Sequence, residues 1–230
     1  MSQLGLVDTS NRTVRPISEV SKMLDFSKLQ HSDKVIHPDG SVEQTVQYMK
    51  DIVRDHYKSV DKLADHLHDP KLSRFLRNIF NFIMAYVKYE KDSAFMEQLR
   101  VPLRTLQEQK GDCDCMSILI GSLLYAKNIP FNFRITKYNG RSEFQHVYVV
   151  VPNNSKGYTV VDPVIKEFDK EKPFDEKKDF LMDGRLSGLF GLNGMPIQLL
   201  NGHSSISGVS LAGGYYGLYG DIMAVTFGYG

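Results

Sequence analysis

Three residues in the second half of the chain have the types and the order of a cysteine-nucleophile triad: Cys113, His146 and Asp162. In such a triad the thiolate attacks a carbonyl carbon, the imidazole moves the proton, and the carboxylate orients the imidazole. His146 opens one strand-like run and Asp162 closes the next, so a hairpin would put them on neighbouring strands. The sequence therefore predicts acyl transfer at Cys113, with His146 as base and Asp162 as its orienting partner.

The surroundings of Cys113 act on its thiol in opposite directions. Cys113 stands at the predicted start of a helix, where free backbone N–H groups favour an anion by about 0.3–1 kcal/mol. Asp112 and Asp114 oppose this by raising the thiol pKa, so activation requires an imidazole partner. The Cys113 backbone N–H is one oxyanion donor, and Gln107 and Gln109 are the candidates for a second. A surface role for both glutamines stays open.

The second cysteine, Cys115, is expected to be a buried thiol, because two positions along a helix face in different directions. A disulfide with Cys113 is excluded, since bridged Cα atoms usually lie about 4.4–6.8 Å apart with converging side chains. Zinc binding by Asp112, Asp114, His146 and the two thiols is also disfavoured, because adjacent helical residues cannot all face one tetrahedral ion. We expect neither a metal nor another cofactor.

Hydrophobic periodicity predicts the elements that must hold these residues. Apolar residues at spacings of three and four predict helices, and strict alternation predicts strands. The first predicted helix begins at a capping box of Ser41 and Gln44, has apolar residues at helical spacing to Val53, and continues, bent or broken, as far as His68. Two more are predicted at 70–88, with Pro70 as first residue, and at 113–127. The predicted strands span 131–138, 145–151 and 158–164, with an Asn-Gly turn after the first. The fold class is α+β, with an antiparallel meander packed against the helix that begins at Cys113.

The rest of the chain is divided by composition. Residues 91–112 are predicted to be a loop with a short helical piece, and the charge-crowded run 166–179 a solvated linker or frayed helix. Residues 184–230 hold 12 of the 18 glycines. The expected domains are a helical extension at 1–69, a catalytic core at 70–183 and a glycine-rich tail at 184–230. The tail is expected to wrap the domain or to meet a protein partner.

The motifs around the triad resemble the transglutaminase-like core of bacterial and phage proteins. G-D-C-D at 111–114 begins a helix that ends in N-I-P, and H-V-Y-V-V-V and V-V-D-P follow in order. Y-V-K-Y at 86–89, Pro102 and Leu106 extend the likeness, which covers about residues 75–165. The resemblance implies a nucleophile-bearing helix on an antiparallel sheet. It places the family's Cys, His and Asp roles on Cys113, His146 and Asp162.

The resemblance also implies a reaction and a protein or peptide substrate, attacked at a peptide or glutaminyl amide bond. The chain has no Trp, the residue that cross-linking transglutaminases use to assist the oxyanion hole, so hydrolysis is favoured over transamidation. The alternative is a catalytically silent structural or assembly module, for example phage-encoded, that keeps the fold. The helical N-terminal third and the glycine-rich tail favour that alternative.

Composition limits the other possibilities. The formal net charge of +1 provides no overall field that would draw the chain to nucleic acid or to an anionic membrane. No run reaches the roughly 20 apolar residues of a spanning helix, and the first residues lack a signal-peptide pattern. Two cysteines without a disulfide fit a reducing compartment. The expected location is the cytoplasm, or a phage particle assembled there.

Overall fold

A computed structural model describes residues 12–29, 34–36, 41–92, 97–153 and 157–182, together with strand residues 214–215 and 225–226. The chain divides into two compact units, Met1–Arg185 and Leu186–Gly230. In the second unit, β9 (Gly214–Tyr215) pairs antiparallel with β10 (Val225–Thr226). The expected wrapping or binding role of the tail lies outside the described residues. None of the described helices has the length and apolar character needed to cross a membrane.

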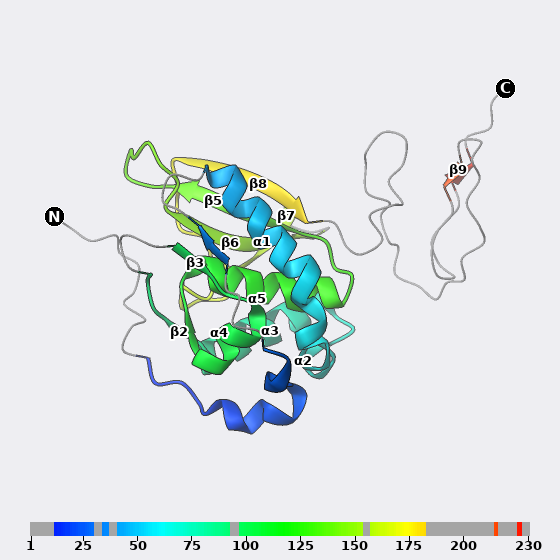
Figure 1. Cartoon of the computed structure of the whole chain (residues 1–230). Coiled ribbons are helices and arrows are strands. Elements are labelled where there is room, and N and C mark those ends of the chain that lie inside the picture. The colour runs from blue at the N-terminus through cyan, green and yellow to red at the C-terminus, as the bar shows by residue number, and fades with distance from the viewer. Residues whose placement is uncertain are drawn as a thin grey trace. The chain divides into compact units, whose positions relative to one another are not determined.

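The first unit is built on a four-stranded antiparallel sheet (Figure 1). Its strands, in spatial order, are β7 (Gly157–Val161), β6 (His146–Asn153), β5 (Phe131–Lys137) and β8 (Glu176–Met182). The predicted meander of three strands is confirmed as β5, β6 and β7. Asn139 and Gly140, between β5 and β6, have φ of 59° and 66°, the left-handed backbone that an Asn-Gly turn adopts at low cost.

Strand β8 corrects the prediction of a solvated linker or frayed helix for residues 176–179, whereas residues 166–175 form turns and irregular chain. The strand pairs with β5 over its whole length, and most of its side chains are exposed. Because β8 lies at the edge of the sheet, it can carry charged residues. These charges remove the apolar alternation by which a strand is predicted from sequence. Two of those charges, Lys177 and Asp179, share the outer face of the sheet with residues of β5.

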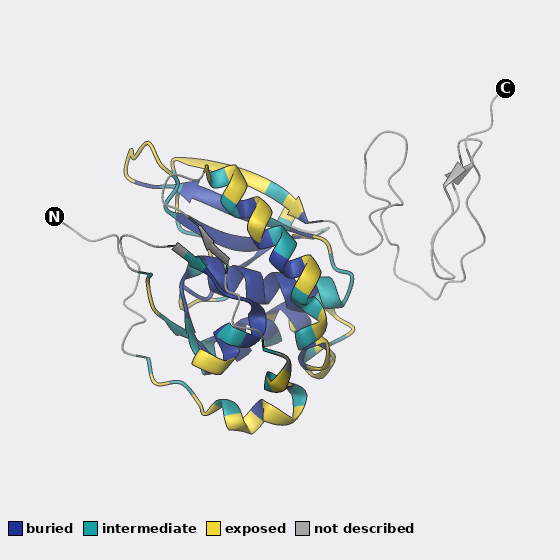
Figure 2. Cartoon of the chain, viewed as in Figure 1, coloured by how far each residue is buried: buried dark blue, intermediate teal, exposed yellow. Residues whose placement is uncertain are grey.

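Helix α5 (Cys113–Ala126) is the centre of the first unit, and its span agrees with the prediction. It is buried from Asp114 to Leu124 and is almost continuously dark blue in Figure 2. Gly121 lets the helix approach the sheet closely, because an added Cβ there would lie 2.7 Å from Cζ of Phe131. Ser117 Oγ donates to the carbonyl of Val147 at 3.3 Å, which ties the helix directly to β6.

The N-terminal helices α1 (Val42–His56) and α2 (Asp61–Leu67) pack on α5. The predicted capping box is confirmed: Gln44 N donates to Ser41 Oγ at 3.2 Å, and Ser41 N donates to Gln44 Oε1 at 3.0 Å. Residues 57–60 form a 3-10 turn, so the helix is broken as expected. Buried side chains of α1, such as Met49, belong to the same core as the sheet. The helical extension expected at residues 1–69 therefore shares one core with the sheet, and its boundary at residue 69 stays a prediction.

Helix α3 (Leu72–Tyr86) starts two residues later than predicted. Pro70 lies outside it, because Asp69 Oδ1 accepts from Lys71 N at 2.7 Å and closes a turn there. The predicted short helical piece in 91–112 is α4 (Pro102–Glu108), with Pro102 as its first residue. Four short strands were missed, and they lie in two pairs: β2 (Lys88–Tyr89) runs parallel to β4 (Lys110–Gly111), and β1 (Lys34–Ile36) pairs antiparallel with β3 (Glu97–Leu99).

Candidate active site

Cys113 is the first residue of α5 and is partly exposed. Asp112 caps the helix, with its Oδ1 accepting from Cys115 N at 3.0 Å. The chain enters this cap through β4, where Gly111 packs so closely that an added Cβ would lie 2.7 Å from Cβ of Cys115. The local sequence thus fixes the thiol at a helix N-terminus, with one acidic side chain on each side of it.

His146 and Asp162 are brought together at one end of the sheet. His146 is the first residue of β6, and Asp162 directly follows β7. The His146 Nε2 lies 2.7 Å from Asp162 Oδ2, and the two residues are only 7% and 3% exposed. Asp162 Oδ1 also accepts from Val164 N at 3.1 Å, which fixes the carboxylate. A carboxylate only accepts, so Nε2 donates and Nδ1 is the ring nitrogen left for a substrate or a thiol.

Cys113 lies against the start of the strand that carries His146. The backbone N–H of Val147, the residue after His146, is hydrogen-bonded to the Cys113 thiol. Burial raises the thiol pKa by more than this hydrogen bond lowers it. The Ser117–Val147 hydrogen bond holds the two elements together one helical turn further on. The contact between the Cys113 sulfur and Nδ1 of His146 stays a prediction, as do the catalytic roles of all three residues.

The electrostatic surroundings keep Cys113 protonated in the resting molecule. Burial raises the pKa of the Cys113 thiol well above its usual value, and Asp114 and Asp112 raise it further, while the Val147 N–H opposes them. The thiol donates to Asp114 Oδ1 over 3.8 Å. The effect of Asp112 and Asp114 on the thiol pKa has the sign that the sequence predicted. A neutral thiol must give up its proton during the attack, which makes a nearby imidazole base necessary.

Two tyrosines, Tyr89 and Tyr138, lie near Cys113. Burial raises the pKa of Tyr89, and Cys113 and Asp112 raise it further. Tyr89 pairs in register with Gly111, two residues before Cys113. Burial also raises the pKa of Tyr138, which is 3% exposed, and Asp162 and Cys113 add to this effect. The site is therefore bordered by phenols that stay protonated through the physiological pH range.

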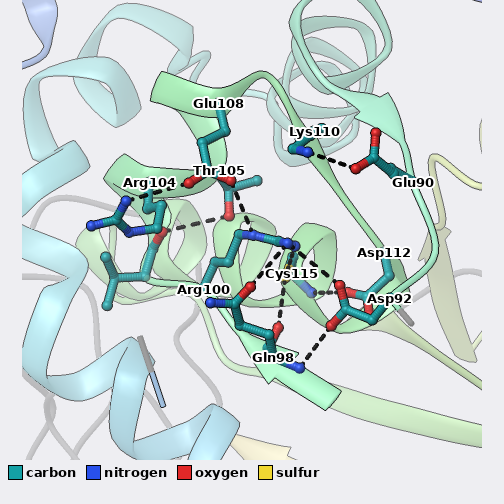
Figure 3. Close-up of polar contacts among 11 residues, drawn as sticks. Glu90, Asp92, Gln98, Arg100, Arg104, Thr105, Glu108, Lys110, Asp112 and Cys115 are labelled. Carbon is teal, nitrogen blue, oxygen red and sulfur yellow. Dashed lines mark hydrogen bonds and ion pairs between the residues drawn. The ribbon is translucent and has the colours of Figure 1, made fainter. Parts of the chain in front are cut away.

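Behind the first turn of α5 lies a network centred on Arg100, which Figure 3 shows. The guanidinium donates to Cys115 Sγ at 3.5 Å, to Gln98 Oε1 at 3.1 Å and to Asp92 Oδ1 at 3.4 Å. Its Nε lies 3.3 Å from Glu108 Oε2. Cys115 is fully buried, as expected, and burial followed by Asp112 raises its pKa well above the usual value. Arg100 thus joins β3, α4 and α5 behind the nucleophile.

A second network, centred on Arg134, lies on the sheet face opposite α5. Arg134 binds Asp179 through two bonds, Nε to Oδ1 at 2.7 Å and Nη2 to Oδ2 at 2.8 Å. Its Nη1 donates to Glu171 Oε1 at 2.7 Å. Glu171 also accepts the hydroxyls of Tyr148 and Tyr158, each at 2.7 Å. Sequence reasoning missed this network. The one signal available was the two-residue spacing of His146 and Tyr148, which puts them on one face of a strand.

The two glutamines predicted as oxyanion donors, Gln107 and Gln109, have different surroundings. Gln109 has a left-handed backbone (φ 52°) and its Nε2 donates to the carbonyls of Arg15 and Tyr86, at 2.6 Å and 3.0 Å. Both of its amide hydrogens are therefore used, one on the N-terminal segment and one on the end of α3. Gln107 is exposed on α4, and its role stays a prediction. In the described parts of the chain, no group of three or more His, Cys, Asp or Glu side chains could hold a metal ion.

Comparisons with family models, curated proteins and solved structures give no match to this chain. What the molecule itself defines is a mixed helix and sheet fold with a cysteine at the N-terminus of a buried helix and a buried His–Asp pair at one end of the sheet.

Proposed function

We propose that the chain is a cysteine-nucleophile acyl-transfer domain of the transglutaminase-like kind. Cys113 is the nucleophile, His146 the base and Asp162 the residue that orients His146. The observation that carries the proposal is the buried 2.7 Å contact between His146 Nε2 and Asp162 Oδ2, at the start of the strand that lies against Cys113. A purely structural sheet gains little from burying such a pair, since desolvation offsets much of the attraction.

The resting protonation of Cys113 determines the first step. His146 Nδ1 accepts the thiol proton as the sulfur forms a bond to the carbonyl carbon of a peptide or glutaminyl amide. The carbonyl oxygen becomes an oxyanion, which the Cys113 backbone N–H stabilises. When the C–N bond breaks, His146 returns the proton to the departing amine or ammonia and a thioester remains. Water then attacks the thioester with His146 again as base, and this releases a carboxylic acid and the free thiol.

We favour water over an amine as the second reactant, because the triad serves both outcomes and the chain has no Trp to assist an oxyanion hole for cross-linking. The substrate is a protein or peptide, and the proposed location is the cytoplasm or a phage particle. A silent structural module is the second candidate. The observation in its favour is that burial, Asp114 and Asp112 all raise the pKa of the proposed nucleophile.

Acylation and selective labelling test the proposal. A p-nitrophenyl ester should leave one acyl group on Cys113, located by peptide mass analysis, and iodoacetamide should modify Cys113 about a hundredfold faster than the buried Cys115. Because the pKa of Cys113 is raised, labelling should speed up as the pH rises beyond the usual thiol range. His146→Ala should slow acylation by on the order of 10²–10⁴-fold, and Asp162→Asn should impair it by misorienting the imidazole.

The matched control is Cys115→Ala, which leaves Cys113 in place and should still be acylated. A glutaminyl peptide offered with a primary amine separates hydrolysis from transamidation, because only the second couples the amine to the peptide. If Cys113 is not acylated, or if His146→Ala reacts as fast as the unchanged protein, the enzyme assignment fails and the silent module takes its place.

A further inference from the structure

His146 has a second neighbour besides Asp162, the aromatic ring of Tyr148. The two ring centroids lie 5.3 Å apart with an interplanar angle of 30°, a stacked arrangement. Both residues are on β6, two positions apart, so their side chains share one face of the sheet. Val147 and Val149 face the opposite side and belong to the main core, while Tyr148 and Val150 form a separate cluster.

The far end of the Tyr148 side chain is firmly held. Its hydroxyl donates to Glu171 Oε1 at 2.7 Å, and the same oxygen accepts from Arg134 Nη1 at 2.7 Å. Arg134 is in turn fixed by its two bonds to Asp179 on the neighbouring strand. Tyr148 is 2% exposed, so its ring has no freedom to leave this position without breaking a charge-assisted contact.

We propose that Tyr148 is a positioning residue for His146, and that Glu171 is the anchor that holds Tyr148 against the imidazole. The proposal deepens the proposed function and rests on it for the importance of His146. Asp162 fixes only one atom of the imidazole, Nε2, and the ring can still rotate about that contact. A ring stacked on the face of the imidazole removes this rotation and fixes the plane in which Nδ1 lies. The two-residue spacing predicts that His146 and Tyr148 share one face of the strand, whereas the contact between Tyr148 and Glu171 depends on the tertiary fold.

Tyr158 provides a matched control within the same network. Its hydroxyl donates to the other oxygen of Glu171, Oε2, also at 2.7 Å. Its ring, however, lies on the guanidinium of Arg134 at 4.2 Å and comes from β7. Tyr148→Phe and Tyr158→Phe therefore remove equivalent hydrogen bonds from one carboxylate. Only the first change frees a ring that touches His146.

The test follows the Nε2–H proton of His146 by NMR in protein labelled with ¹⁵N at histidine, with the signal assigned by its loss in His146→Gln. Exchange of that proton with water reports how tightly the imidazole is held. Tyr148→Phe should speed exchange about fivefold, the population change expected when one hydrogen bond is lost, and Tyr148→Leu should speed it further. Tyr158→Phe should leave it within about twofold of the unchanged protein.

Thermal unfolding of each variant is measured in parallel, because loss of a network bond also costs stability. Equal acceleration in the two Phe variants, or none in Tyr148→Leu, would overturn the positioning role and leave Tyr148 as a structural residue. The measurement needs no turnover. An inert Cys113 together with the expected difference in exchange would therefore reject the proposed function while the coupling of Tyr148 to His146 stands.

Discussion

Two buried arginines hold the two halves of the candidate site, and they do so in different ways. Arg134, behind His146, makes three bonds of 2.7–2.8 Å to two carboxylates. Arg100, behind Cys113, spreads its contacts over a thiol, an amide and two carboxylates at 3.1–3.5 Å. Short charge-assisted bonds with paired geometry are stronger and more directional than long ones to mixed partners.

This difference assigns distinct tasks to the two sides of the site. The histidine side is fixed by a compact ionic cluster that spans all four strands and the segment after Asp162. The nucleophile side is fixed more loosely, and burial followed by its carboxylates raises the pKa of both thiols. Under the proposed mechanism, this arrangement favours a rigidly held His146 that accepts a proton from the neutral Cys113 thiol, rather than a resting ion pair between sulfur and imidazole.

The largest expected effect distinguishes the two arginines directly. Arg134→Met should lower the free energy of unfolding by about 3 kcal/mol, because it leaves two carboxylates without their buried cation. Arg100→Met should cost about 1–2 kcal/mol, the value of a few weaker hydrogen bonds. Urea denaturation of the three proteins measures both values.

Lys178→Met is the control for that pair, because Lys178 meets Glu43 in an exposed ion pair of 3.1 Å. An exposed pair should contribute less than about 1 kcal/mol. Should Arg100→Met prove as costly as Arg134→Met, the contrast between a tightly and a loosely held half would be wrong.

A smaller effect should appear in the pH dependence of stability, with opposite signs for the two sides. Burial raises the pKa of Asp179, but the bonds from Arg134 lower it by a larger amount, so the pKa in the folded protein lies below the usual value. The stability from this group is present above the usual carboxyl pKa of about 4 and is lost as the pH falls. The raised pKa of Cys115 gives the reverse: its contribution is complete below about pH 8.5 and is lost as the pH rises.

Two substitutions isolate these limbs when the urea midpoint is measured from acid to alkaline pH. Asp179→Asn should flatten the acid limb and leave the alkaline limb unchanged. Cys115→Ala should flatten the alkaline limb alone. A variant that changes the opposite limb would show that the groups named are not the ones that titrate.

The smallest effect is expected from removal of residues 184–230. In the described chain, the buried core cluster runs from Val20 to Met182, and its members all lie within the first unit. The truncated protein should keep a cooperative unfolding transition, within about 0.5 kcal/mol of the full chain. Loss of cooperativity on truncation would mean that the tail completes the core.

Local patterns in the sequence were sufficient for much of this fold. The capping box at Ser41 and Gln44, the Asn-Gly turn, helix 113–126 and the three-strand meander depend on residues close together in the chain. The order of Cys113, His146 and Asp162 predicted that the last two would lie on neighbouring strands, because a hairpin joins them. Periodicity did not reveal β8, since an edge strand with charged side chains has no apolar alternation to detect.

The two arginine networks could not be inferred from the sequence, because their members have no characteristic spacing, and those of the Arg134 network also lie far apart in the chain. Arg134 meets Glu171 and Asp179 across 37 and 45 residues of chain. Glu171 lies in a charge-rich segment, and the sequence does not distinguish it from its charged neighbours. Only the tertiary fold brings it to two tyrosines and an arginine. Residue types and order along the chain were enough to nominate a nucleophile, a base and an orienting acid. How firmly each one is held depends on partners that only the packed sheet and helices bring within hydrogen-bond distance, because such bonds weaken steeply with small changes in geometry.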